Sequence, residues 1–283
     1  MILAGFVLLA VGAADLVRQF VPRRWIGYLA AAVVLLLLGS VSDALLPMVV
    51  ALVAGALWVW CMPDDRPSPA GFWPAVVLAL LVVGAVVWTG GRAHAGLVGA
   101  VWQLRSPFGE VSFDLAMLVL GLSAFLLESA NLVVRAALDG EHTWRPAEQV
   151  ADAPVVVDAT AAGDTAASTI TDTAATTVAP VAPAAAAAGG EPTAVAAAAD
   201  SRSGFKGGRL IGPLERILIL ILTLAAAYPI LAAMLAAKGI VRFPEISRDG
   251  ETGARAEYFL VGSLVSWVIA LGGAFLVWWA AHS

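Results

Sequence analysis

The chain has 283 residues, of which 60% are hydrophobic and 13% are charged, and its mean hydropathy is +0.88. A soluble domain carries roughly 25% charged residues, so this composition excludes a single water-soluble globular domain. Apolar stretches of fifteen or more residues recur along the chain, as expected for helices that cross a hydrocarbon core about 30 Å thick. We therefore predict an all-α fold, a polytopic transmembrane helical bundle.

The charged residues indicate which partners and which kind of source organism the sequence favours. The net charge is −5, but residues 151–200 alone hold five Asp and one Glu and no Lys or Arg. No basic run with interleaved aromatic residues is present, so we expect no nucleic-acid partner. Only Lys206 and Lys238 are lysines among the sixteen basic residues. This usage favours a GC-rich bacterial genome, and we expect a multi-pass protein of the bacterial plasma membrane.

Few residues could support metal or hydrolytic chemistry. Cys61 is the only cysteine, and His94, His142 and His282 each lie in a loop or tail with no acidic or histidine partner at metal-ligand spacing. We therefore expect no disulfide within the chain, no metal site and no cofactor. Phosphate-binding loops, His-Glu-x-x-His and Gly-x-Ser-x-Gly motifs are also missing from the sequence. A non-enzymatic protein is therefore favoured. A membrane-embedded enzyme that acts on a lipid-linked substrate is a less favoured hypothesis.

The first predicted span begins at the first residue of the chain. Residues 1–14 are apolar, with no preceding basic region and no small-residue cleavage site before Asp15, so we expect a retained helix rather than a cleaved signal peptide. Asp15 and Arg18 are spaced i and i+3 and are expected to pair structurally at the interface. In chain order the predicted spans, about seven in number, cover residues 1–18, 25–40, 43–61, 72–89, 112–138, 211–238 and 257–280.

Local signals refine these spans. The second and third form one apolar run, and residues 39–43 contain Gly39, Ser40, Ser42 and Asp43 as a turn signal, so a tight helical hairpin is expected. Trp58 and Trp60 are expected in an interfacial belt at the end of the third span. Pro47 and Pro229 fall inside predicted spans, where a kink is tolerated.

Glu128 is a carboxylate well inside the fifth predicted span, where an unpaired charge is costly. Asn131 and Arg135 follow at i+3 and i+7, within about 60° of the same helical face. The three should form a polar stripe that faces protein or water. One interpretation is a proton or ion relay, for which Glu128, Asn131 and Glu215 form a candidate intramembrane polar site. The favoured alternative is a buried hydrogen bond between helices.

Residues 140–206 differ in composition from the rest of the chain. They are rich in Ala, Thr, Asp, Pro and Gly, and no aromatic residue lies between Trp144 and Phe205. Such a segment cannot bury enough apolar surface to fold, so we predict a long disordered linker. It divides the chain into an N-terminal membrane bundle of about five helices, residues 1–139, and a C-terminal transmembrane hairpin, residues 207–283.

Charged residues gather in the C-terminal hairpin. Lys238 and Arg242 lie at i and i+4, so they project from one side of a helix, and Glu245 and Glu257 are near enough in sequence to neutralise them across the turn. We regard these four residues as a candidate docking or headgroup site. The structural alternative is a charge-paired turn with snorkelling basic side chains.

This hairpin resembles the C-terminal part of an uncharacterised bacterial integral-membrane protein family of unknown function. The resemblance covers about residues 209–266, roughly a fifth of the chain. It implies that the hairpin is a genuine module but implies no activity. The residues involved are the Arg-x-Ile-Gly-x-Leu-Glu-Arg opening at 209–216, the Lys-x-x-x-Arg-Phe-x-Glu-Ile turn at 238–246 and the Glu-Tyr-Phe-Leu segment at 257–260.

Two further expectations concern packing and orientation. Gly262, Ser266 and Ala270 recur every four residues, with Gly273 near the same face, which is typical of a face where helix backbones approach closely. With seven spans, ten basic residues fall on the side of the first loop and six on the other side. The positive-inside rule then favours an external N-terminus and a cytoplasmic C-terminus.

These observations favour a non-enzymatic membrane subunit or scaffold that docks a partner or a lipid through its C-terminal hairpin. The alternative is a small proton- or ion-coupled transporter or channel that uses Glu128. The expected partners are the lipid bilayer and either another membrane protein or a second copy of the chain.

Overall fold

The computed structural model describes residues 1–63, 71–89, 92, 96–106, 109–140, 208–247 and 254–283. Nearly all of them are helical, which confirms the predicted all-α bundle. Four of the described helices are long and apolar enough to cross a membrane, and three shorter apolar helices accompany them. The predicted linker lies outside the described residues from residue 141 onward.

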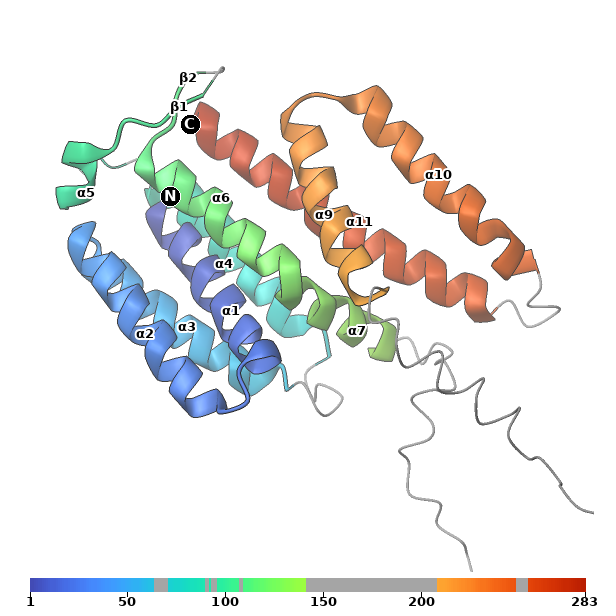
Figure 1. Cartoon of the computed structure of the whole chain (residues 1–283), viewed down its shortest axis with the longest axis horizontal. Helices are drawn as coiled ribbons and strands as arrows, with labels where there is room; N and C mark the ends of the chain where they lie inside the picture. Colours follow the sequence, from blue (N-terminus) through green and yellow to red (C-terminus); the bar gives the residue numbers. More distant parts are fainter. Residues whose placement is uncertain (64–70, 90–91, 93–95, 107–108, 141–207, 248–253) are drawn as a thin grey trace, which may run out of the picture. The chain divides into compact units, whose positions relative to one another are not determined.

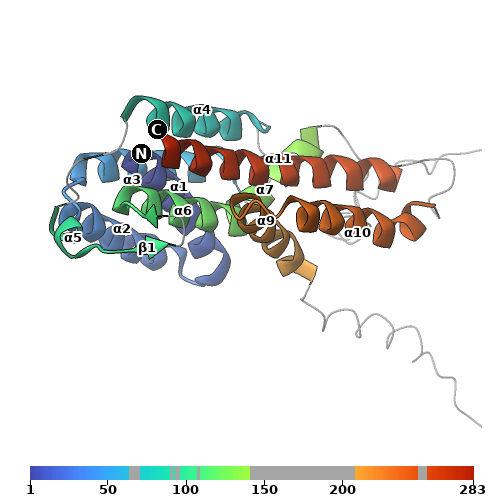
Figure 2. The same ribbon diagram turned by 90° about the horizontal axis from the view of Figure 1, so that it is seen from above.

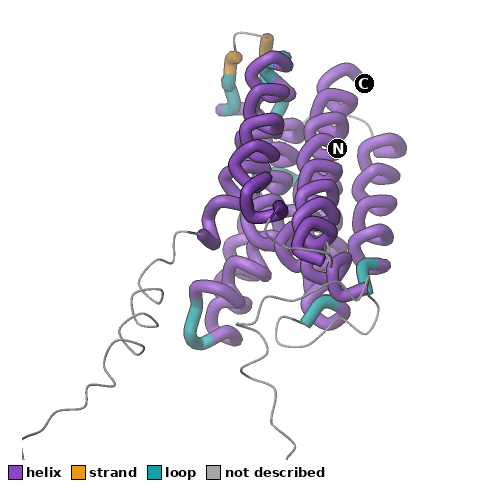
Figure 3. The backbone as a smooth tube through the Cα atoms, turned by 90° about the vertical axis from the view of Figure 1, so that its right-hand side faces the viewer, coloured by secondary structure: helices purple, strands orange, loops and turns teal. Residues whose placement is uncertain are grey.

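The elements are shown along the chain in Figure 1, and a short β-ribbon at one end of the bundle stands out in Figure 3. In order they are α1 (Ile2–Phe20), α2 (Arg24–Val41), α3 (Leu45–Cys61), α4 (Trp73–Thr89), α5 (Gly96–Val101), β1 (Arg105–Ser106), β2 (Gly109–Glu110), α6 (Phe113–Ala124), the π-helical segment η1 (Phe125–Ser129), α7 (Ala130–Gly140), α9 (Gly208–Leu224), α10 (Tyr228–Ser247) and α11 (Ala254–His282).

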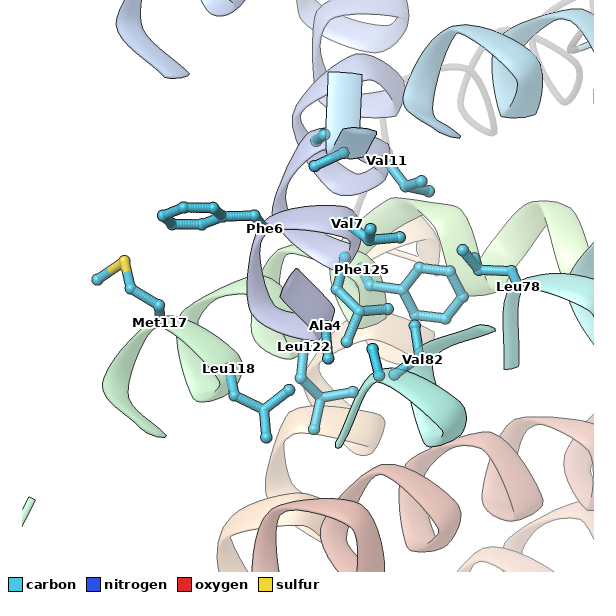
Figure 4. Close-up of a cluster of buried hydrophobic side chains, with 14 of the residues drawn as sticks. Ala4, Phe6, Val7, Val11, Leu78, Val82, Met117, Leu118, Leu122 and Phe125 are labelled. Atoms are coloured by element: carbon cyan, nitrogen blue, oxygen red, sulfur yellow. The ribbon is translucent and has the colours of Figure 1, made fainter. Parts of the chain in front are cut away.

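Helix α1 is the centre of the N-terminal bundle, where it packs against α2, α3, α4 and α6. Phe6, Val7 and Val11 are fully buried, and Figure 4 shows Val7 meeting Val82 of α4 and Phe125 of η1. Lipid tails are as apolar as these side chains, so close van der Waals packing holds such helices together. The core therefore depends on shape complementarity around α1.

Glycines set the distance between α1 and α6. A Cβ atom on Gly12 would lie 2.6 Å from the backbone carbon of Ala124, and one on Gly5 would lie 2.7 Å from the backbone nitrogen of Leu118. No side chain fits in either place. Because Gly5 faces Leu118 and Gly12 faces Ala124, the two helices run parallel.

The predicted hairpin of the second and third spans is confirmed as α2 and α3. The chain reverses at Asp43, whose φ is +51°, and the Ser42 hydroxyl donates to the carbonyl of Leu38 at 2.8 Å. Gly39 lies against Met48 across the hairpin. Asp is among the residues that tolerate left-handed backbone, which explains why this turn needs no glycine at position 43.

The predicted sixth span, residues 211–238, is not one helix. It contains the antiparallel helices α9 and α10, joined by a turn in which Ala226 has a φ of +53°. The amide of Ala227 donates to the carbonyl of Leu222 at 2.9 Å, as in a Schellman ending. Pro229 is therefore the second residue of α10 rather than a kink, since proline is well tolerated in the first turn of a helix.

The contacts of α9, α10 and α11 fix their directions. Glu215 of α9 contacts both Lys238 of α10 and Trp267 of α11, and Ile219 clusters with Leu231 and Ala270. From one contact to the next, residue numbers increase in the same direction in α9 and α11 and in opposite directions in α9 and α10. Helices α9 and α11 are thus parallel to each other. Helix α10, which lies between them in the sequence, is antiparallel to both.

Both chain termini lie at one end of the bundle. The Met1 amine donates to the Thr89 hydroxyl at 2.5 Å, and α11 runs antiparallel to α6 and α7, since Gly262 faces Leu138 and Gly273 faces Leu122. Figures 1 and 2 show the two termini close together. We call this the Met1 end and the opposite end the Phe20 end. The prediction that the termini lie on opposite sides was wrong, because residues 211–238 turn back.

Candidate functional site

A polar cavity lies where the C-terminal helices pack against α7. Its volume is about 290 Å³, at the lower limit of typical ligand pockets. Four helices contribute to its wall, and we call this cavity the hairpin cavity. The residues that line it are Asn131, Val134, Arg135 and Leu138 from α7, Gly212, Glu215 and Arg216 from α9, Lys238 from α10, and Gly262, Ser263 and Ser266 from α11.

Arg216 is the most deeply buried cation of the cavity, with 1% of its surface exposed. Its Nη2 donates to the side-chain oxygen of Asn131. Gly212, one turn earlier in α9, leaves room for the guanidinium, since a Cβ there would lie 3.3 Å from Nη2. The Nε of Arg216 is buried without a hydrogen-bond partner, which is costly for a charged group.

Glu215 joins the three C-terminal helices. Lys238 Nζ lies 2.7 and 2.6 Å from the two carboxylate oxygens of Glu215, and the indole nitrogen of Trp267 donates to the same carboxylate at 2.8 Å. The ammonium also lies 5.5 Å from the centre of the Trp267 ring and 5.8 Å from that of Phe259, within the range of cation–π attraction. One carboxylate thus holds α9, α10 and α11 together.

Glu128 lies in η1, next to the cavity rather than in its wall. The Asn131 amide nitrogen is 3.4 Å from a Glu128 carboxylate oxygen, and Asn131 in turn accepts from Arg216. The predicted polar stripe therefore faces other helices, with Asn131 and Arg135 on the cavity. A hydrogen-bonded link between η1, α7 and α9 is the arrangement expected for a buried interhelical contact.

The structure combines the two sites that the sequence suggested separately. Asn131 and Glu215, assigned to an intramembrane site, line the same cavity as Lys238, assigned to a docking site. The carboxylate that binds Lys238 is Glu215, whereas sequence proximity had suggested Glu245 and Glu257. Glu257 is exposed. The side chains of Arg242 and Glu245 lie outside the described residues.

Three residues at or beside the cavity were not predicted from the sequence as site residues. Arg216 and Ser263 line the cavity, and Trp267 donates to Glu215. Neighbouring residues on a helix point about 100° apart, so Glu215 and Arg216 necessarily face different helices. An acidic residue followed directly by a basic residue within an apolar helix was therefore the sequence signal for a buried polar site.

Other sequence expectations about polar residues can be compared with the structure. Asp15 and Arg18 pair as predicted, at 3.2 Å, but inside the protein, where the Trp58 indole also donates to Asp15 at 2.8 Å. Trp58 is thus buried among the helices near the end of α3. Ser266 and Ala270 are buried on the face of α11 predicted to pack closely. That packing face is within the chain.

The hairpin cavity lies close to the edge of the apolar spans. The apolar part of α11 begins at Phe259, and that of α10 ends at Val241. Ser263 is four residues inside the first limit and Lys238 three inside the second, which corresponds to about 4.5 to 6 Å at 1.5 Å per residue. This depth is near the boundary between the hydrocarbon core and the headgroups, rather than at the bilayer centre.

The cavity chemistry suits an anion. Three cations, Arg135, Arg216 and Lys238, line it with one carboxylate, Glu215. Within the described ranges, no group of three or more His, Cys, Asp or Glu residues could hold a metal ion. No family model, curated protein or solved structure matches the chain, so its function must be argued from this geometry.

Proposed function

We propose that the protein is a non-enzymatic subunit or scaffold of a bacterial plasma membrane that docks a lipid or a partner protein through its C-terminal hairpin. The observation that supports this most is the convergence of four helices on one cavity with a surplus of cations. Two carboxylates near the cavity, Glu128 and Glu215, are already bonded to Asn131 and Lys238. Cations outnumber carboxylates in the wall of the cavity, which favours an anionic group of a ligand.

The distribution of basic residues supports a cytoplasmic Phe20 end. Among the described residues, only Arg92 and Arg105 are near the Met1 end, and Arg216 and Lys238 lie midway along α9 and α10. Positive charge is concentrated on the cytoplasmic side of membrane proteins. The difference between the two ends is larger, in proportion, than the ten against six that seven spans gave. The seven basic residues nearest the Phe20 end are Arg18, Arg23, Arg24, Arg135, Arg209, Arg242 and Arg255.

A cytoplasmic cavity is well placed for docking. The cytoplasmic leaflet carries anionic lipids whose potential attracts basic residues, and cytoplasmic partner proteins also approach from this side. The ion pair between Glu215 and Lys238 joins α9 to α10, and the Trp267 indole joins Glu215 to α11. The hairpin therefore presents its cations on a fixed frame, which lowers the entropy cost of binding.

The test is purification of the tagged protein from its native host in a mild detergent, followed by mass spectrometry of the accompanying proteins and lipids. The Lys238→Ala/Arg242→Ala variant should lose a stoichiometric companion. The matched control is Arg23→Ala/Arg24→Ala, which removes two positive charges at the start of α2, outside the C-terminal hairpin. Equal recovery of the companion with both variants would contradict docking through the hairpin.

A transporter that uses Glu128 is the alternative, and one observation favours it. Glu128 lies in the π-helical segment η1, and such segments occur frequently at functional sites. In reconstituted vesicles, a Glu128→Gln protein would then lose proton-coupled or ion flux, whereas the docking proposal expects no flux from either protein. Flux that persists in Glu128→Gln would remove the basis of the alternative.

A further inference from the structure

We propose that the hairpin cavity binds the phosphate of an anionic phospholipid from the cytoplasmic leaflet, with the acyl chains outside the protein. This inference rests on the proposed docking function and names its ligand class. It differs from a general attraction to the membrane surface, because it assigns one lipid phosphate to one cavity.

The volume of the cavity agrees with a headgroup. A volume of about 290 Å³ is at the small end of ligand pockets, so it suits a phosphate and its ester oxygens rather than a whole lipid or a nucleotide. Lys238 and Ser263 lie about 4.5 to 6 Å inside the apolar limits of their helices. Lipid phosphates lie outside the hydrocarbon core, so a lipid must sit slightly deeper than in the free bilayer to place its phosphate in the cavity.

The wall of the cavity offers an unsatisfied donor to an anion. The charges of Glu215 and Glu128 act on the Arg216 guanidinium, but its buried Nε still lacks a hydrogen-bond acceptor. A buried donor without an acceptor is destabilising. A phosphate in the cavity would supply acceptor oxygens to Arg216 and to Lys238, while the Ser263 and Ser266 hydroxyls line the same space and can donate to phosphate oxygens.

The surroundings of the cavity favour a lipid over a soluble anion. Ile240 and Val241 of α10 and Leu260 and Leu264 of α11 are exposed, with between 61% and 73% of their surface accessible. In a membrane, such apolar surface faces acyl chains. A phosphate held at Lys238 would thus have apolar helix faces on both sides, against which the two chains of a phospholipid can lie.

The experiment measures lipid binding by native mass spectrometry and by thermal unfolding of the full-length protein in detergent. Phosphatidylglycerol, phosphatidylcholine and inorganic phosphate are titrated separately. Phosphatidylglycerol should bind and raise the unfolding midpoint, and phosphatidylcholine should bind at least about fivefold more weakly, the factor for one cation near an anionic bilayer surface. Inorganic phosphate alone should have little effect.

Two variants test the cavity. Arg135→Gln removes one cation and leaves the Glu215–Lys238 pair intact, so it should weaken phosphatidylglycerol binding about fivefold in a folded protein. Ser266→Leu should fill the cavity and weaken binding without a change of charge. Arg23→Gln is the control, because it removes an exposed cation in the same half of the molecule and should bind phosphatidylglycerol as the wild type does.

Each outcome has a definite meaning. Equal binding of phosphatidylglycerol by Arg135→Gln, Ser266→Leu and Arg23→Gln would overturn the proposal, as would equal binding of phosphatidylcholine. Stabilisation by inorganic phosphate alone would keep an anion site but overturn its lipid source. If the co-purification experiment yields a protein companion while the lipid variants bind normally, the docking function stands and the lipid inference fails.

Discussion

Arg216 and Asn131 are 85 positions apart in the chain and are joined by a hydrogen bond inside the protein, from the guanidinium Nη2 to the amide oxygen. This contact connects α9 to α7 and couples the C-terminal hairpin to the N-terminal bundle. Asn131 also reaches Glu128 through its amide nitrogen. A neutral amide can donate to an acid and accept from a base at the same time, which suits this position.

Substitution of Asn131 by Leu is predicted to destabilise the protein. Arg216 would stay buried and lose an acceptor, and a hydrogen bond to a charged group contributes about 1.5–3 kcal/mol. The free energy of unfolding in mixed detergent micelles measures the loss. Asn131→Gln keeps both the acceptor and the donor of the amide and should lose less. Equal stability of Asn131→Leu and the wild type would show that the contact contributes nothing.

The pair of Asp15 and Arg18 supports a second prediction. Asp15 is 1% exposed and accepts from both Arg18 and Trp58. Asp15→Leu leaves a buried cation without its acid, and the loss of one partner from a buried ion pair costs about 3–5 kcal/mol. Arg18 retains a bond to the carbonyl of Met62, so we expect the lower part of this range in chemical unfolding.

The double variant Asp15→Leu/Arg18→Leu is the comparison for this experiment. It removes both charges, and apolar replacement of a whole buried pair is often nearly neutral. It should therefore be more stable than Asp15→Leu alone. The account fails at this site if the double variant is the less stable of the two.

Helix packing gives a third prediction, with a matched control in the same chain. Gly12→Ala would place a Cβ atom 2.6 Å from the backbone of Ala124, whereas the same change at Gly239 meets no atom within 4 Å. Overpacking costs about 1–3 kcal/mol, and alanine in an open helical position gains up to about 1 kcal/mol over glycine. Thermal unfolding should show a lower midpoint for Gly12→Ala and an equal or higher one for Gly239→Ala.

The turn between α9 and α10 gives a fourth prediction. Ala226 has a φ of +53°, which costs an L-residue other than glycine roughly 1–2 kcal/mol. Ala226→Gly should remove part of this cost and raise the unfolding midpoint. The same change at Ala225, at the end of α9, should not. A lower midpoint for Ala226→Gly than for Ala225→Gly would contradict the turn.

Sequence reasoning recovered features that depend on short-range patterns. Span composition, the turn at Asp43, the pairing of Asp15 with Arg18 and the packing face around Ser266 all follow from residues close together in the chain. The turn at Ala226 was missed because alanine occupies the left-handed position where glycine is usual. The local signal is Pro229, which favours the first turn of a helix but is also tolerated as a kink inside a membrane span.

The cavity itself could be predicted only in part. The contact between Arg216 and Asn131 joins residues far apart in the chain, and its existence depends on how α9 packs on α7. Once residues 211–238 are read as one span, Lys238 is placed on the wrong side of the bundle, and its pairing with Glu215 cannot be found. One missed turn thus concealed both the cavity and the orientation of the C-terminal helices.

The measurement that tests this account most directly is the labelling of single cysteines by a membrane-impermeant maleimide, in a Cys61→Ala protein expressed in intact cells. Ser283→Cys reports the Met1 end, and Phe20→Cys and Glu257→Cys, both at exposed positions, report the Phe20 end. We predict that Ser283→Cys is labelled from outside and that the other two react only after the membrane is permeabilised. Labelling of Glu257→Cys but not of Phe20→Cys in intact cells would contradict the hairpin of α9 and α10, and labelling of both with protection of Ser283→Cys would contradict the cytoplasmic position of the cavity.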